Sequence, residues 1–115
     1  MPLFAAICFD HPPHAMALRD GVRADHRAYV LANAAPIRCA GAMRDAAGNQ
    51  CGSIFVFDTT SEADVRAWFQ GEPFYCAGVY ESVRIVLWSP AFNQLAACDW
   101  PAAPQSSPLA SPLVN

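Results

Sequence analysis

The sequence contains no lysine, and its seven basic side chains are all arginines that form no continuous run. Charged residues make up only 15% of the 115 residues, and the formal net charge is -3. Proteins that bind nucleic acid usually concentrate Lys and Arg on one face, where they neutralise phosphates. The scattered arginines therefore argue against nucleic acid as a partner.

Long apolar runs are also missing. None approaches the roughly 20 residues that a membrane-spanning helix requires. The segment 1–14 has no basic leader, which argues against a signal peptide. Five cysteines occur without a CxxC pair, so the spacing matches neither a disulfide framework nor a zinc knuckle. These absences predict a cytoplasmic protein without membrane contact, whose cysteines are reduced and mostly buried.

Apolar residues account for 54% of the chain, enough for the core of one domain. Residues 1–90 carry the regular patterns expected of that domain. Residues 91–115 differ in composition, because they contain four of the ten prolines between Asp99 and Asn115. We expect a C-terminal arm followed by a flexible, proline-rich tail.

Hydrophobic spacing predicts alternating strands and helices along the first 90 residues. A helix is expected at 15–34, and a second, short helix follows the capping residues 60–62 and ends near Gly71. Residues 72–78 are expected to form an irregular link. The predicted strands are 3–9, 37–44, 51–58 and 79–88, the middle two forming a hairpin.

This order, β-α-β-β-α-β, is typical of the ferredoxin-like α+β fold. It predicts a four-stranded antiparallel sheet with both helices on one face. The other sheet face would be bare in a single copy, and apolar sheet faces need a cover. A homodimer is the arrangement that we expect to provide it.

The first predicted helix combines apolar and basic residues on one side. His26 lies one turn after Val22 on the apolar stripe, and Arg23 precedes His26 by one turn. Arg19 lies one turn before Arg23, so these basic groups can converge at the inner edge of the helix. The alternative is structural, because a single helical His often only fills a core. Arg19 and Arg23 could likewise form a solvated face or pair with Asp20 or Asp25.

Four stretches in the first 90 residues resemble the YCII-related domain family. The first is the strand that ends at Asp10-His11-Pro12, and the second is the pattern R-x-x-x-R-x-x-H that ends at His26. The others are the hairpin from Ala40 to Ser53, similar to AGP-x-x-D…G-S, and the stretch 72–83, similar to DP[YF]…AG-[VL]-[FY]-E-x-V. Each motif is weak alone, but the four occur in the family's order.

The resemblance implies a dimeric α+β barrel, related to muconolactone isomerase-like enzymes. It also implies a His paired with a carboxylate, and activity in the catabolism of small aromatic rings, including dehydrochlorination of a hydroxyquinol. Two positions depart from the family pattern. Glu72 stands where the family has Asp, so its carboxylate lies one methylene further from the backbone. Ala42 stands where the family has Pro, which loosens the entry to the hairpin.

A histidine can exchange a proton near neutral pH, and a carboxylate on one ring nitrogen sets its tautomer. We therefore take His26 as the catalytic residue, with Asp10 or Glu72 as its acid. Arg19 and Arg23 would bind an anionic oxygen of a small aromatic or quinone-like substrate, with Ser53 and Phe74 beside it. This lyase or isomerase chemistry requires neither metal nor organic cofactor. The alternative is a non-catalytic binding or accessory protein that uses the same pocket, in which Glu72 is a helix-end group and Phe74 a core or dimer contact.

Two other groups of residues have side chains that could form a site. His11 and His14 flank two prolines, but an H-x-x-H spacing in a proline loop does not direct both rings toward one ion. No metal site is predicted there. Cys76 lies beside Tyr75, and nothing nearby in the sequence would lower its pKa enough to make it a nucleophile.

Overall fold

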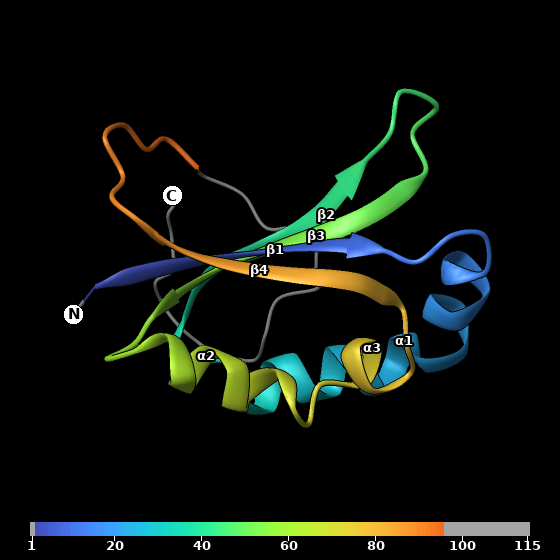
Figure 1. Ribbon diagram of the computed structural model, residues 1–115, viewed down its shortest axis with the longest axis horizontal. Helices are drawn as coiled ribbons and strands as arrows, with labels where there is room; N and C mark the ends of the chain where they lie inside the picture. Colours follow the sequence, from blue (N-terminus) through green and yellow to red (C-terminus); the bar gives the residue numbers. More distant parts are fainter. Residues whose placement is uncertain (1, 96–115) are drawn as a thin grey trace.

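The computed structural model describes residues 2–95, and Figure 1 shows their arrangement. Four strands and three helices follow one another between residues 2 and 95. They are β1 (Leu3–Asp10), α1 (Ala15–Ala32), β2 (Ile37–Arg44), β3 (Gln50–Asp58), α2 (Glu62–Phe69), α3 (Pro73–Cys76) and β4 (Tyr80–Trp88). Of the arm and tail predicted for 91–115, residues 96–115 lie outside the described part of the chain.

The strands form one antiparallel sheet in the order β2-β3-β1-β4. In the register of the central strands, Ala6 of β1 is opposite Phe55 of β3 and Ile85 of β4. The helices lie together on one face of this sheet, and no described element covers the other face (Figure 1). The ferredoxin-like α+β fold predicted from the sequence is therefore confirmed.

The core fills the space between the sheet and the helices. Alternate residues of β1 point toward the helices, as the twofold repeat of a strand requires. They pack with aromatic residues of β3 and with the inner faces of α1 and α2. The buried residues of this core are Phe4, Ala6, Cys8, Val30, Phe55, Phe57, Val65, Trp68 and Phe69.

Helix α1 presents a mixed face to this interior. Its buried residues are Ala15, Arg19, His26 and Val30, so two basic residues are buried along with the apolar ones. Arg19 and His26 are seven residues apart, which places them two turns apart on one side of the helix. The fold thus buries two titratable groups that must find partners there.

The link 72–78 was expected to be irregular, and this prediction was wrong in one respect. It contains α3, a single helical turn, so the sheet face carries three helices rather than two. The local reason is that Pro73 occupies the first turn, where its missing N–H costs nothing. The carboxylate of Glu72 caps the helix by accepting from the backbone N–H groups of Phe74 and Tyr75.

The described residues include four of the five cysteines and the three helices α1, α2 and α3. Among the four cysteines within them, only Cys8 is buried; Cys39 and Cys51 are intermediate and Cys76 is exposed. The expectation that most cysteines are buried was therefore wrong for this part of the chain. None of the helices between residues 2 and 95 is long and apolar enough to cross a membrane.

Candidate active site

His26 and Glu72 form a buried pair between α1 and the start of α3. The His26 Nδ1 lies 2.5 Å from the Glu72 Oε2. Glu72 has no exposed surface, and His26 is 8% exposed. With Glu72 ionised, Nδ1 is the donor, because an ionised carboxylate can only accept hydrogen bonds. Of the two acids that the sequence left open, Glu72 is the one that lies against His26.

The Glu72 carboxylate has two further donors. Its Oε2 accepts from the N–H of Phe74 at 2.9 Å, and its Oε1 accepts from the N–H of Tyr75 at 3.1 Å. Three donors thus surround one buried charge, which offsets the cost of removing the carboxylate from water. Glu72 is a helix-end group and the histidine's partner at the same time, two roles that the sequence presented as alternatives.

Tyr29, one turn after His26 on α1, contacts the backbone that precedes Glu72. The Tyr29 hydroxyl donates to the carbonyl oxygen of Trp68 at 2.6 Å. A Cβ at Gly71 would lie 3.1 Å from the Tyr29 ring, so only a glycine fits there without displacing a neighbour. This contact fixes the chain just before Glu72 against the helix that carries His26.

Phe74 lies parallel to the His26 ring. The two ring centroids are 3.7 Å apart and the planes differ by 8°. Phe74 is 1% exposed, and the Arg19 guanidinium carbon lies 4.8 Å from its ring centroid. Phe74 was expected beside a substrate, but in the structure its ring packs on His26 and Arg19.

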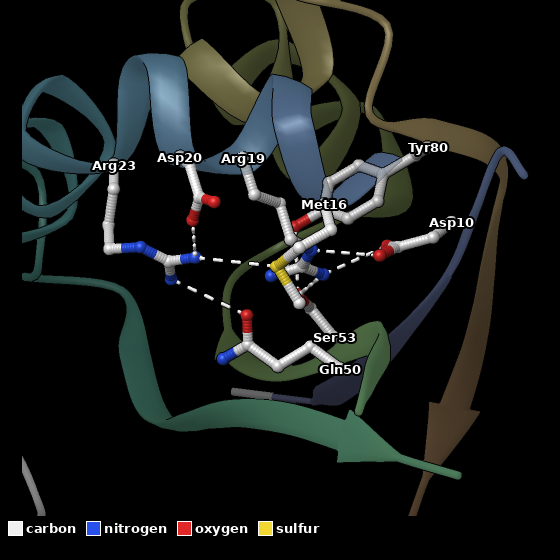
Figure 2. Close-up of polar contacts among 8 residues, drawn as sticks. All are labelled: Asp10, Met16, Arg19, Asp20, Arg23, Gln50, Ser53 and Tyr80. Carbon is white, nitrogen blue, oxygen red and sulfur yellow. Dashed lines mark hydrogen bonds and ion pairs between the residues drawn. The ribbon is translucent and has the colours of Figure 1, made fainter. Parts of the chain in front are cut away.

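Arg19 and Asp10 form a second buried pair, at the carboxyl end of β1. Arg19 donates from Nε and Nη2 to the two Asp10 carboxylate oxygens, at 2.8 and 2.9 Å (Figure 2). Burial by itself lowers the pKa of Arg19, but the hydrogen bond and charge of Asp10 outweigh it and raise that pKa above its ordinary value. Asp10 therefore binds Arg19 rather than His26.

Ser53 and Tyr80 complete this cluster. The Ser53 Oγ accepts from Arg19 Nη2 at 3.1 Å and from the Tyr80 hydroxyl at 2.9 Å. Burial, together with the nearby Cys8 thiol, raises the pKa of Tyr80 well above its usual range, so the phenol remains a donor. Tyr80 was not among the site residues predicted from the sequence. The sequence feature that could have identified Tyr80 is its position in β4, on the side of the strand that faces the helices.

Arg23 lies closer to the surface. Its guanidinium donates to the Asp20 carboxylate at 2.9 Å and, from another nitrogen, to the Gln50 side chain at 3.4 Å (Figure 2). The side chain of Arg23 is 33% exposed, whereas that of Arg19 is 2% exposed. Of the two arginines predicted to bind substrate, Arg23 is therefore the one that solvent can reach.

A hollow of about 430 Å³ opens between α2, α3 and β4. Neither His26 nor Glu72 lines it. Tyr80 lines it and also belongs to the cluster around Arg19, so the hollow adjoins that cluster. The other lining residues are Arg66, Phe69, Gln70, Tyr75, Glu81, Ser82, Val83 and Ile85.

The fold occurs in solved structures of other proteins. A 5-chloro-2-hydroxyhydroquinone dehydrochlorinase, TftG from Burkholderia phenoliruptrix AC1100 in complex with 2,5-dihydroxybenzoquinone, is 24% identical with a TM-score of 0.68; the match covers 76% of this chain and 93% of that one. A candidate antibiotic biosynthesis monooxygenase from Bacteriodes thetaiotaomicron VPI-5482 is 9% identical with a TM-score of 0.53, covering 84% and 95%. These likenesses show a shared fold.

No curated protein matches the chain in sequence. The model of the YCII-related domain matches residues 3–89, which is the whole sheet with its helices. The match spans all four stretches that carried the resemblance, including the positions of His26 and Glu72. The chain belongs to the YCII-related domain family.

Proposed function

We propose that this protein is a lyase or isomerase that uses His26 and Glu72 to transfer a proton on a small aromatic or quinone-like metabolite. The observation that carries the proposal is the 2.5 Å contact between Nδ1 of His26 and a fully buried carboxylate. A His oriented by an acid is the arrangement that general acid–base catalysis requires. The dehydrochlorinase with the same fold, bound to a dihydroxybenzoquinone, supports the choice of substrate class.

The proposed chemistry starts at the far nitrogen of the ring. With Nδ1 donating to Glu72, Nε2 takes a proton from an acidic hydroxyl or ring C–H of the substrate. The imidazolium that forms is stabilised by the Glu72 charge. In an elimination, the electron pair released on the substrate forms the new double bond and the leaving group departs as an anion. In an isomerisation, His26 returns the proton at another carbon.

Arg23 is the residue that we propose to hold the substrate's developing negative charge. It is a partly exposed guanidinium one turn from His26, and guanidinium groups bind phenolate and carboxylate oxygens by paired hydrogen bonds. Arg19 was expected to share this task, with Ser53 and Phe74 in contact with the substrate beside it. Their donors and surfaces are engaged inside the protein, so we assign substrate contact first to Arg23.

A second hypothesis is that the pair is structural and the protein binds a small molecule without transforming it. The capping of α3 by Glu72 and the low exposure of His26 favour this reading. It differs from the first in one consequence. A structural His26 would alter stability when replaced, whereas a catalytic one would alter turnover at unchanged ligand affinity.

The experiment is an assay of His26→Asn and His26→Ala against hydroxyquinols, chlorinated hydroxyquinols and lactones. We expect turnover to fall by about 10² to 10⁴ fold, the usual contribution of a general acid–base group. His14→Ala is the matched control, because His14 is exposed and its side chain makes no capping bond. Equal rates in wild type and variants would exclude the mechanism. Binding of 2,5-dihydroxybenzoquinone without turnover of any compound would favour the second hypothesis.

We also propose that two copies pair through the sheet face opposite the helices. Large apolar residues from three strands lie exposed on it: Phe9, Ile54, Val86 and Trp88 are 39–49% exposed. Ile7 of β1 is opposite Ile54 of β3, so the patch continues across the sheet. A contiguous exposed patch of this kind is typical of an interface.

Sedimentation analysis of the wild type should give a mass of twice the chain's 12.4 kDa. Ile54→Glu places a charge in the middle of the patch, and we expect it to convert the protein to monomers. Leu31→Glu is the control, since Leu31 is 47% exposed but lies on α1, on the other side of the sheet. A wild-type monomer, or an Ile54→Glu dimer, would contradict this arrangement.

A further inference from the structure

We propose that Arg19 is a positioning residue for His26, acting through the ring of Phe74. The inference rests on the proposed function and assigns Arg19 a role other than substrate contact. Arg19 and His26 lie two turns apart on α1, and the proposed link between them requires no direct contact. Both contact Phe74, the second residue of α3, so the ring links the Arg19–Asp10 pair to the His26–Glu72 pair.

The guanidinium of Arg19 is fixed on several sides. Two hydrogen bonds join it to the Asp10 carboxylate, and a third joins it to the Ser53 hydroxyl. Its carbon lies 4.8 Å from the centroid of the Phe74 ring and 5.9 Å from that of Tyr80. The charge is thus neutralised by Asp10, while the flat group packs on two aromatic rings. Its side chain is 2% exposed, so a substrate would have to displace Asp10 to reach it.

Phe74 transmits this constraint to both catalytic groups. Its ring lies 3.7 Å from that of His26, nearly parallel, and its backbone N–H donates to the same Glu72 oxygen that binds His26. A shift of Phe74 would therefore move the ring that supports the imidazole and the donor that holds the carboxylate. The distance between Nδ1 and Oε2 depends on both.

The choice of arginine follows from this geometry. A lysine would keep the positive charge near Asp10, but its ammonium has no plane to lie over Phe74 and cannot donate two parallel hydrogen bonds to one carboxylate. Arg19→Lys thus separates the positioning role from simple charge balance. Phe74→Leu tests the same link from the other end, because it removes the ring and keeps an apolar side chain in the core.

The test observes the Nδ1 proton of His26 directly, by nitrogen-15 NMR of histidine-labelled full-length protein. Its exchange with solvent is compared with that of the core amide of Phe57, so that a loss of overall stability, which speeds both, cancels. We expect the ratio of the two exchange rates to rise at least about tenfold in Arg19→Lys and in Phe74→Leu. Arg38→Lys, at an exposed arginine of β2 that pairs with Asp58, should stay within about twofold of wild type.

Unchanged ratios in both variants would overturn the proposal, and so would a wild-type Nδ1 proton that exchanges as fast as in free histidine. Should Arg19→Lys fail to fold, Phe74→Leu decides by the same measurement, with Asp10→Asn as a third variant. No substrate is required. The result is therefore independent of the turnover assay of His26, and an inactive protein could still show that Arg19 positions the ring.

Discussion

Replacing Glu72 by alanine is expected to lower the free energy of unfolding by about 3 kcal/mol or more, because each buried donor left without its acceptor costs about 1–3 kcal/mol. Three donors lose their acceptor at once: Nδ1 of His26 and the backbone N–H groups of Phe74 and Tyr75. Water has little access to the site, because Glu72 has no exposed surface, Phe74 is 1% exposed and His26 is 8% exposed. Urea unfolding followed by circular dichroism measures the loss.

Glu62 provides a matched control. It also lies at a helix start, and its carboxylate pairs with Arg66 at 2.9 Å, but both side chains are about half exposed. Surface pairs of this kind contribute about 0.5 kcal/mol, so Glu62→Ala should be nearly neutral. Glu72→Gln should lie between the two, because the amide oxygen can still accept from the α3 backbone. A Glu72→Ala variant as stable as Glu62→Ala would show that the buried pair does not hold α3 in place.

Replacing Gly52 by alanine is the second change with a large expected effect. Gly52 lies in β3 opposite Phe9 of β1 and Met43 of β2. An added Cβ would come within 2.3 Å of the Cys8 carbonyl oxygen and of the Met43 methyl carbon. The methionine can move, but the carbonyl belongs to a central strand paired on both sides. We expect a loss of about 3 kcal/mol, at the upper end for overpacking, measured by thermal unfolding.

Gly41 is the comparison for that variant. It lies in β2, at the edge of the sheet, and a Cβ there would meet nothing within 4 Å. Gly41→Ala should change stability by no more than about 0.5 kcal/mol, as for surface substitutions in general. If the two alanine variants unfold at the same temperature, the close approach at Gly52 does not constrain the strand.

The regular elements could be predicted because their signals are local and repeated. The expected strand 37–44 has the bounds of β2, and the expected strand 51–58 differs from β3 by one residue at its start. The helix expected at 15–34 ends two residues earlier, at Ala32. Each of these elements is eight or more residues long, so its hydrophobic period shows in the sequence. The family motifs led to the same order of elements independently.

Helix α3 escaped prediction because a single turn has no period. Its four residues include a proline and two aromatic side chains that would suit a loop equally well. The signal in the sequence was the pair Glu72-Pro73, an acceptor followed by a residue that favours the first helical position. That signal is short, and only the packing of the turn against α1 makes it a stable helix.

By itself, the sequence determined the fold and the face of α1 that bears Arg19 and His26, because helical spacing alone sets which residues share a face. It also supplied two carboxylates, Asp10 and Glu72, without deciding which one His26 meets. Only the tertiary structure decided this. The end of β1 brings Asp10 to Arg19, and α3 brings Glu72 to His26, with Phe74 between the two pairs. Contacts between residues far apart in the chain depend on tertiary packing, which a local sequence pattern does not predict.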